Sequence, residues 1–313
     1  AAVEPGAGAI NCERAAMDNP TYQQKLDQEG ELWGRVAEES ARSVPPDWRS
    51  HRVLRHNAIM HTRHIDALLS QVRPGMHTLE LGCGAGWLTL ALAQQGAIAR
   101  GLDISAPAVA IAEQYYASIK PAVSGRVLYE VADLNAVELP ANTYDIIAAK
   151  GVLHHLYAVD RLIEQVHAAL KPGGLFWVSD THGSEATSTA LIAGALMLVL
   201  PTQTSYRQKL GGLLRFRAGA PARIKASIQA DNLSPFEGAG REHDWLAMIA
   251  ERFEIERHSE HPAVTGYLTA QLRLPDRMAL PLLRGLYRLD HALVRRGVLK
   301  NTGKVLYARK RAV

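Results

Sequence analysis

The sequence predicts an α/β fold built on a doubly wound, mostly parallel sheet. Short apolar runs alternate with helical patterns from Gly75 onward, and a glycine-rich turn joins the first run to the first helix. No apolar run approaches the roughly twenty residues that a membrane-spanning helix needs. The composition agrees, because 47% of the 313 residues are hydrophobic and 21% are charged, which excludes a disordered or fibrous chain.

The first part of the chain is expected to lie outside the sheet. Residues 1–20 contain three acids and lack the basic start and apolar run of a secretory signal, so we expect a disordered extension. Residues 21–73 carry periodic apolar positions interrupted by Pro45 and Pro46. This pattern predicts two or more amphipathic helices that form a lid or flank.

Residues 74–182 are expected to form the ligand-binding core. The predicted strands are His77–Leu81, Ala99–Leu102, Val127–Val131, Tyr144–Ala149 and Leu175–Ser179. The predicted helices are Trp87–Gln95, Ala106–Ile119 and Ala158–Leu170, and the last of these leads into a Pro172-Gly173-Gly174 turn. Because ligands of open α/β sheets bind at the carboxyl ends of the strands, the site is expected at that edge.

The pattern loosens after Asp180. Residues 183–252 are expected to form an insertion that covers the site, and residues 253–313 to complete the sheet around inserted helices. The predicted elements are helices at Ala186–Leu200, His243–Arg252 and Asp276–Leu299, strands at Phe253–His258 and Val305–Arg309, and an irregular stretch at Pro201–Asn232.

The most informative stretch runs from Leu79 to Trp87 and reads Leu-Glu-Leu-Gly-Cys-Gly-Ala-Gly-Trp. Its glycines let the backbone approach a ligand closely, and the following helix offers unpaired N–H groups to negative charge. A dinucleotide fingerprint needs a third glycine three residues after the second. Here that position is Trp87 and the third glycine is Gly86, so the loop is Gly-x-Gly-x-Gly.

This loop resembles the first motif of the class I S-adenosylmethionine (SAM)-dependent methyltransferases, in particular the small-molecule group that includes quinone-biosynthesis enzymes. The resemblance covers roughly Gly75 to Asp180 and implies a Rossmann-like core that binds SAM and releases S-adenosylhomocysteine (SAH). It implies that Glu80 organises the loop or meets the cofactor's amino group. The residues that it places around the aminoacyl part are Glu80, Gly82, Cys83, Gly84 and Gly86.

Further positions follow the family's order. Asp103 ends the second predicted strand, where its two oxygens can accept hydrogen bonds from both ribose hydroxyls, and Ile104 follows it. Asp133, followed by Leu134, resembles the segment whose carboxylate accepts a hydrogen bond from the adenine amino group. Lys150 opens a segment that in the family passes close to the sulfonium and the acceptor.

Methyl transfer is an in-line displacement, so the protein mainly aligns the reactants and excludes water. A hydroxyl acceptor must also lose a proton, which a histidine near neutral pKa can take. His154 and His155 are the predicted general bases, and the alternative is that they pack or cap the turn. Asp180 and His182 are secondary candidates, and Asp180 is also suited to capping a nearby helix.

Histidines and tryptophans outside the motifs have two interpretations each. His61 and His64 would share a helix face at a spacing that can bind metal, but no cysteine or carboxylate cluster accompanies them. We therefore expect no metal and favour polar helix surface or a lid contact, as for His51 and His56. Three tryptophans would stack on an aromatic acceptor or belong to the core: Trp33, Trp48 and Trp87.

The net charge is only +4, but the basic residues are unevenly placed. Residues 186–230 contain no acid, and the basic residues there are Arg207, Lys209, Arg215, Arg217, Arg223 and Lys225. A second basic cluster comprises Arg295, Arg296, Lys300, Lys304, Arg309, Lys310 and Arg311. Such segments suit an anionic membrane surface or an acceptor carrying phosphate or carboxylate, and equally solvated helix faces. No nucleic-acid module accompanies them, so nucleic acid is not an expected partner.

The resemblance implies an enzyme that methylates a small, amphiphilic or lipid-linked acceptor, at a hydroxyl oxygen. A noncatalytic SAM-binding partner subunit and a nicotinamide-dependent oxidoreductase are the alternatives; the intact loop disfavours the first and Trp87 the second. Two isolated cysteines, Cys12 and Cys83, support neither a disulfide framework nor a cysteine zinc site and fit a reducing cytoplasm. The acceptor, the methylated atom and the oligomeric state stay open.

Overall fold

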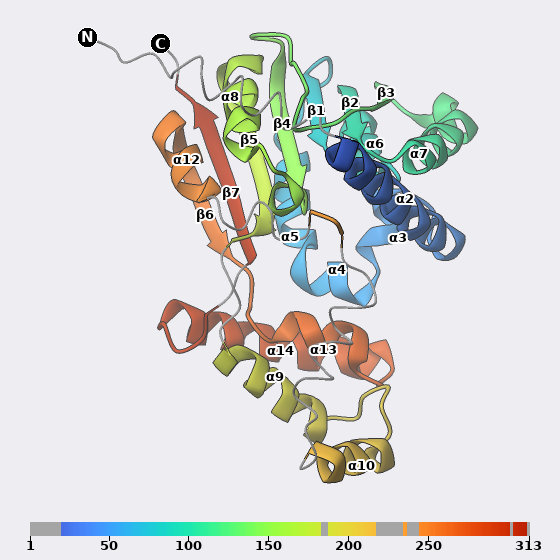
Figure 1. Ribbon diagram of the computed structural model, residues 1–313, viewed down its shortest axis with the longest axis vertical. Helices are drawn as coiled ribbons and strands as arrows, with labels where there is room; N and C mark the ends of the chain where they lie inside the picture. The colour runs from blue at the N-terminus through green and yellow to red at the C-terminus, as the bar shows by residue number, and fades with distance from the viewer. Residues whose placement is uncertain (1–19, 183–186, 217–233, 237–243, 301–302, 312–313) are drawn as a thin grey trace.

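The computed structural model describes residues 20–182, 187–216, 234–236, 244–300 and 303–311. A seven-stranded sheet runs in the order β3-β2-β1-β4-β5-β7-β6 (Figure 1). Its strands are β1 (His77–Leu81), β2 (Ile98–Asp103), β3 (Arg126–Val131), β4 (Tyr144–Lys150), β5 (Leu170–Thr181), β6 (Phe253–Glu260) and β7 (Gly303–Lys310). The first five strands pair in parallel and β7 pairs antiparallel with β5 and β6, so the predicted mostly parallel α/β sheet is confirmed.

Helices cover both faces of this sheet. The helices that follow the strands are α6 (Trp87–Gln94), α7 (Ala106–Ile119), α8 (Val159–Ala169) and α12 (Trp245–Arg252), with short turns η1 (Lys120–Ala122) and η2 (Leu153–His155). Successive residues of β4 point to opposite faces: Ile147 packs in the cluster that includes α8 and α12, and Ile146 in the cluster that includes α6. Burial on both faces explains why β4 is apolar without alternation.

The sequence-based element predictions are wrong in three places. Strand β5 begins at Leu170, five residues before the predicted Leu175, and the Pro172-Gly173-Gly174 turn lies inside it where the register with β4 shifts. Helix α10 (Tyr206–Phe216) occupies part of the stretch predicted as irregular, and α13 (Thr265–Gln271) was not predicted. Both helices contain glycine, which has a low helix propensity, so the sequence pattern did not predict a helix there. Tertiary packing stabilises these helices.

The N-terminal helices are α2 (Pro20–Ser43), α3 (Trp48–Arg52), α4 (Arg55–Met60) and α5 (Thr62–Leu69). Residues 1–19 lie outside the described residues, so the expected extension stays a prediction. Helix α2 packs along α7 near the carboxyl ends of the strands (Figure 1). His61 is the N-cap of α5, and the rings of His61 and His64 both contact that of His261, so the two histidines lie on the same side of α5 as expected.

Four helices form a separate group below the sheet in Figure 1: α9 (Thr187–Val199), α10, α13 and α14 (Asp276–Arg295). We call this group the helical module. The carboxylate of Asp290 on α14 accepts hydrogen bonds from the backbone N–H groups of Ala263, Val264 and Thr265, which ties α14 to the start of α13. Arg55 on α4 donates to the carbonyl oxygen of Leu272. The contact from Arg55 fastens the module to the N-terminal helices.

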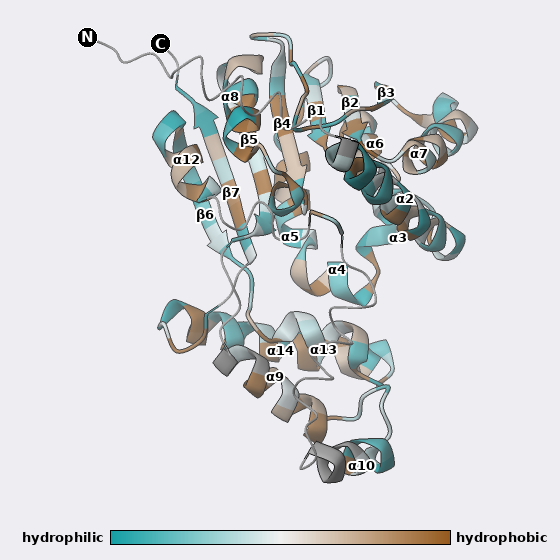
Figure 2. Ribbon diagram, viewed as in Figure 1, coloured by the Kyte–Doolittle hydropathy of each residue, from teal (hydrophilic) through white to brown (hydrophobic). Residues whose placement is uncertain are grey.

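The module exposes apolar side chains that the core does not cover. Figure 2 shows hydrophobic segments along α9 and α14, and Leu191 and Val199 of α9 are 69% and 75% exposed. None of the helices in the described ranges is both long and apolar enough to cross a bilayer.

Candidate active site

A cavity of about 270 Å³ lies at the carboxyl ends of β1, β2 and β4 and beside the loop that follows β3. Helix α2 forms one wall of it. The predicted site residues that line this cavity are Glu80, Gly82, Cys83, Gly84, Asp103, Ile104, Asp133, Leu134, Lys150 and His155. Four candidates do not line it: Gly86, His154, Asp180 and His182. The structure therefore brings together most of the predicted residues, although they span seventy-six positions from Glu80 to His155.

The glycine loop adopts a conformation that other residues reach only with strain. Gly82, Gly84 and Gly86 have φ values of 72°, 49° and 83°. A Cβ added to Gly82 would lie 2.7 Å from a methyl carbon of Val152, and one added to Gly86 would lie 2.6 Å from the ring of Tyr129. Gly86 thus shapes the loop from behind without facing the cavity.

Glu80 holds the start of α6 in place. Gly86 at the N-cap has no side chain to satisfy the first N–H groups of this helix. Glu80 reaches across from β1 and accepts hydrogen bonds from the backbone N–H of Thr89, at 2.7 Å, and from its hydroxyl. Complete burial raises the pKa of Glu80 to about 8, although the two bonds from Thr89 and the charge of Lys150 oppose this shift. A contact with the cofactor's amino group stays a prediction.

Asp103 braces the same loop from β2. Its carboxylate accepts the backbone N–H of Gly84 at 2.7 Å and that of Ser105 at 2.9 Å. Burial raises its pKa despite these bonds. Cys83 lies between the two acids, and burial, then Glu80 and Asp103, raise the pKa of its thiol well above the ordinary value. The thiol is therefore protonated and unsuited to nucleophilic or redox chemistry.

Asp133 connects the loop after β3 to helix α2. One carboxylate oxygen accepts the hydroxyl of Tyr22 at 2.8 Å, and the other accepts the backbone and side-chain N–H groups of Asn135. Burial and the neighbouring carboxylate raise the pKa of Tyr22, so this phenol stays protonated. An adenine amino group would have to share Asp133 with the Tyr22 hydroxyl.

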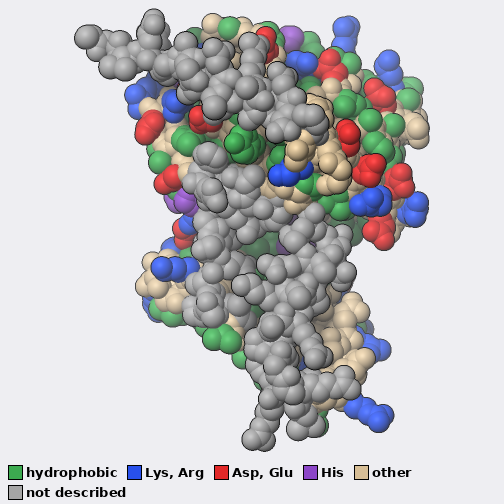
Figure 3. All heavy atoms as spheres, in the orientation of Figure 1, with side chains coloured by type: hydrophobic (Ala, Val, Ile, Leu, Met, Phe, Trp, Pro, Cys, Tyr) green, Lys and Arg blue, Asp and Glu red, His purple; other side chains and the backbone are tan. Residues whose placement is uncertain are grey.

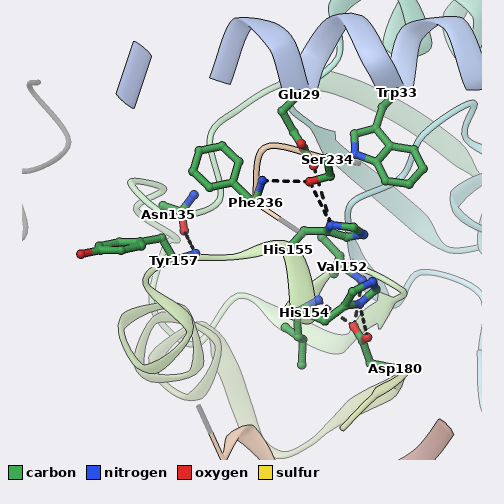
Figure 4. A network of polar contacts seen from close by, with 11 residues as sticks. Glu29, Trp33, Asn135, Val152, His154, His155, Tyr157, Asp180, Ser234 and Phe236 are labelled. Atoms are coloured by element: carbon green, nitrogen blue, oxygen red, sulfur yellow. Dashed lines mark hydrogen bonds and ion pairs between the residues drawn. The ribbon is translucent and has the colours of Figure 1, made fainter. Parts of the chain in front are cut away.

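The two predicted histidines have different surroundings (Figure 4). Nδ1 of His154 lies 2.5 Å from the Asp180 carboxylate, which also accepts the backbone N–H groups of Val152 and Leu153. Asp180 therefore caps the turn after β4 rather than a helix after β5. His182 pairs with Asp244 at 2.9 Å, outside the cavity lining.

His155 is 9% exposed and lines the cavity. Its Nδ1 lies 3.2 Å from the Ser234 hydroxyl and 3.9 Å from a carboxylate oxygen of Glu29, and its ring meets that of Trp33 edge to face (Figure 4). The same Glu29 oxygen accepts the indole N–H of Trp33 at 2.7 Å. A carboxylate beside Nδ1 favours the tautomer with its proton there, which leaves Nε2 with the lone pair of a base.

Sequence reasoning missed Glu29 and Phe236 of this wall and considered His51 only as helix surface or a lid contact. A signal for Glu29 is present in the sequence, because it interrupts an apolar stripe of α2 at helical spacing, between Leu26 and Trp33, and is 5% exposed. A buried acid on an apolar stripe marks either a partner or a site. No comparable local signal identifies His51 or Phe236.

The tryptophans divide between wall and core. Trp33 and Trp87 line the cavity, whereas Trp48 lies behind and stacks on Trp87, with ring centroids 5.2 Å apart. His51 stacks on Trp87 as well, at 5.4 Å. Over the described ranges, no three His, Cys, Asp or Glu side chains are grouped so as to hold a metal ion.

Comparison with known proteins agrees with this geometry. Residues 79–178 match the family model described as a methyltransferase domain. The ubiquinone biosynthesis O-methyltransferase of Mus musculus mitochondria is 28% identical over 167 residues, which cover 53% of this chain and 43% of that protein. The enzyme of the same name from Coxiella burnetii is 31% identical over 121 residues, or 39% of this chain and 50% of that one.

The chain thus spans half or less of the length of these relatives. A solved SAM-dependent methyltransferase from Mesorhizobium loti is 23% identical, with a TM-score of 0.46, over 79% of this chain and 96% of that one. The family match falls on β1 to β5 and on the loops that carry Glu80, Asp103, Asp133 and His155. Residues 79–178 of this chain are therefore a methyltransferase domain of the class I, SAM-dependent type.

Proposed function

We propose that the chain transfers the methyl group of SAM to a small or amphiphilic acceptor, at a hydroxyl oxygen. One observation carries the proposal: the glycine loop, the acid after β2 and a histidine with a carboxylate neighbour face a single cavity. The relatives named O-methyltransferases support the oxygen as the methylated atom. A noncatalytic SAM-binding subunit would need the glycine loop and Asp103 to bind the cofactor. It would not need a histidine beside a carboxylate, as His155 lies beside Glu29.

In the proposed reaction the acceptor oxygen attacks the methyl carbon, the carbon–sulfur bond breaks, and its electron pair returns to sulfur. His155 takes the hydroxyl proton before or during the attack, with Glu29 beside Nδ1 stabilising the imidazolium that forms. SAM supplies an activated methyl group, so the chain needs no nucleophile of its own. Trp33, Phe236 and Leu156 exclude water from this side of the cavity.

Two measurements test the proposal. Calorimetric titration with SAM, SAH and NADH tests the cofactor, and saturable binding of the two sulfur ligands without NADH is the expected result. Incubation with SAM labelled in the methyl group and a panel of phenols, alcohols and amines then tests transfer, with label expected in the phenols. Binding of NADH would favour the oxidoreductase, and SAM binding without transfer to any acceptor would favour the noncatalytic subunit.

We also propose that the helical module contacts the surface of an anionic membrane, which would suit a lipid-linked acceptor. Exposed apolar residues of α9 and α10, among them Leu191, Val199 and Leu210, accompany exposed arginines of α10 and α14, such as Arg207 and Arg288. Figure 3 shows Lys and Arg side chains along the margins of the module. Apolar side chains with surrounding cations are what an anionic bilayer surface attracts.

Sedimentation with vesicles tests this contact. We expect binding to vesicles containing phosphatidylglycerol, weak binding to pure phosphatidylcholine, and loss of binding for the double variant Leu191→Asp, Val199→Asp. Leu128→Asp is the matched control, because Leu128 is an exposed leucine on β3 in the core. Equal binding of the double variant and the control would contradict the proposal. A cytoplasmic location stays a prediction.

A further inference from the structure

Lys150, the last residue of β4, brings its ammonium group to the cavity. Its Nζ lies 5.8 Å from the ring centroid of Trp87, and within the described ranges its side chain makes no hydrogen bond or ion pair. Burial lowers the pKa of Lys150 below its ordinary value, and the charges of Glu80 and Asp180 oppose this shift. Both carboxylates are already engaged, Glu80 with Thr89 and Asp180 with the turn after β4.

The histidines near Lys150 do not compensate its positive charge. His56 and His61 are in ring contact, and His61 is in ring contact with His261. Burial lowers the pKa of these three histidines and of His51, and the positive charge of Lys150 lowers each of them further. The imidazoles are therefore neutral at pH 7. These imidazoles therefore supply no counter-charge to Lys150.

A bound SAM would place its sulfonium in the same cavity. Four acids also line the cavity, but each is held by a partner: Glu29 by Trp33, Glu80 by Thr89, Asp103 by Gly84 and Asp133 by Tyr22. Beside apolar walls such as Trp33 and Phe236, Lys150 and the sulfonium therefore favour an anion as the third group. A cationic amine acceptor would add a third positive charge, and an aliphatic alcohol would bring no negative charge to Lys150. An acidic hydroxyl brings one when it ionises, and an aromatic or enolic body suits the walls.

We propose that Lys150 holds the ionised oxygen of an apolar acceptor with an acidic hydroxyl, a phenol or an enol, beside the cofactor. This inference rests on the proposed function and names its substrate class. The proton leaves the hydroxyl before transfer, through His155 or to water. The oxyanion then attacks the methyl carbon, the electron pair of the carbon–sulfur bond returns to sulfur, and Lys150 remains protonated throughout.

A series of nitrobenzene derivatives with one ring and different charge tests the site. The SAH-saturated chain is titrated with 4-nitrophenol, 4-nitrobenzyl alcohol and 4-nitrobenzylamine, which offer an ionisable, a neutral and a cationic group. We expect 4-nitrophenol to bind about tenfold or more tightly than the other two. Its bound form should show the visible absorbance of the phenolate at a pH where the free compound is largely protonated.

Three variants assign this preference to Lys150. Lys150→Met should lose the preference and the phenolate absorbance, whereas Lys150→Arg should keep both. Lys25→Met is the matched control, because Lys25 is an exposed cation on α2 that does not line the cavity, and it should behave as the unmodified chain. A preference that survives in Lys150→Met, or an unmodified chain that does not prefer 4-nitrophenol, overturns the proposal.

Two further measurements distinguish this proposal from alternative explanations. If 4-nitrobenzoate binds with the same dependence on Lys150 while 4-nitrophenol binds without its phenolate absorbance, the site takes a carboxylate and the acidic-hydroxyl class is wrong. Histidine NMR titration without cofactor should show higher pKa values for His51, His56 and His61 in Lys150→Met; unchanged values overturn the unpaired cation. Failure of SAH to bind, by contrast, overturns the proposed function itself.

Discussion

The cofactor side and the acceptor side of the cavity are built in different ways. The cofactor side comes from three strand ends within residues 80–134 and relies on backbone conformation, as in Gly82 and Gly84, with Asp103 as a brace. The acceptor side comes from α2, α3, the turn after β4 and Phe236, which are far apart in the sequence. It relies on side chains such as Trp33 and His155.

This difference explains why one side carries a motif and the other does not. A backbone with positive φ needs glycine at fixed positions, so the cofactor side must appear as local spacing in the sequence. A wall of side chains can be assembled from any elements that the fold brings together. The acceptor side therefore tolerates variation, and specificity is expected to depend on it.

The largest expected effect is on the cofactor side, from Gly86→Ala. A φ of 83° and a Cβ 2.6 Å from Tyr129 combine strain and a clash, which together cost about 4 kcal/mol. Gly75→Ala is the control, because Gly75 has a φ of 82° but nothing within 4 Å of an added Cβ, and its expected cost is about 1 kcal/mol. Urea unfolding and SAM calorimetry measure both. If both variants lose the same free energy of unfolding, Tyr129 moves aside and the clash at position 86 contributes nothing.

The next effect separates the two sides. His155→Gln is expected to lower kcat for a hydroxyl acceptor about a hundredfold, the usual contribution of a general base, and to leave SAM affinity unchanged. His154→Gln should instead lower stability, since it removes the bond to Asp180, with a smaller effect on kcat. Steady-state kinetics and thermal unfolding distinguish them. If His154→Gln has the larger kinetic effect, the general base has been misassigned.

Asp103→Asn should act on the cofactor side of the cavity, where it also removes one of the bonds that brace the glycine loop. Loss of one charged acceptor is expected to weaken SAM binding by about 2 kcal/mol, roughly thirtyfold, without changing the KM for the acceptor at saturating SAM. Asp133→Asn should have a smaller effect, because Tyr22 and Asn135 already occupy that carboxylate. Calorimetry gives both affinities. An Asp133 effect equal to that of Asp103 would place more of the cofactor's binding energy at the loop after β3.

The smallest effect concerns pH and Glu80. The folded-state pKa of about 8 lies above the ordinary value of 4.5, so the stability contributed by Glu80 is complete below pH 4.5 and is lost as pH rises through about 8. Glu80→Gln keeps an oxygen for Thr89 and cannot ionise. Relative to this variant, the unmodified chain should lose about 1 kcal/mol or more between pH 5 and pH 8.5. If urea unfolding gives the same difference in free energy between the unmodified chain and Glu80→Gln at pH 5 and at pH 8.5, the raised pKa is contradicted.

Much of the fold followed from the sequence because its signals are local. The observed strands β1, β2 and β4 lie within one residue of their predicted bounds, since buried parallel strands are short apolar runs between turn residues. Helices α10 and α13 were missed because glycine lowers their intrinsic propensity and their stability comes from packing. In the site, His154 and His155 are adjacent in sequence, and nothing local tells which of them faces the cavity.

The sequence by itself determined the α/β order, the glycine loop and the acids at the strand ends, because spacing and glycine positions encode backbone geometry directly. Only the tertiary structure decided that Glu29 of α2 lies beside His155, that His154 pairs with Asp180, and that Lys150 faces the cavity without an ion-pair partner among the described residues. These facts depend on side chains that meet across distant elements. Their energies arise from burial and from the partners present, which no single segment of the chain contains.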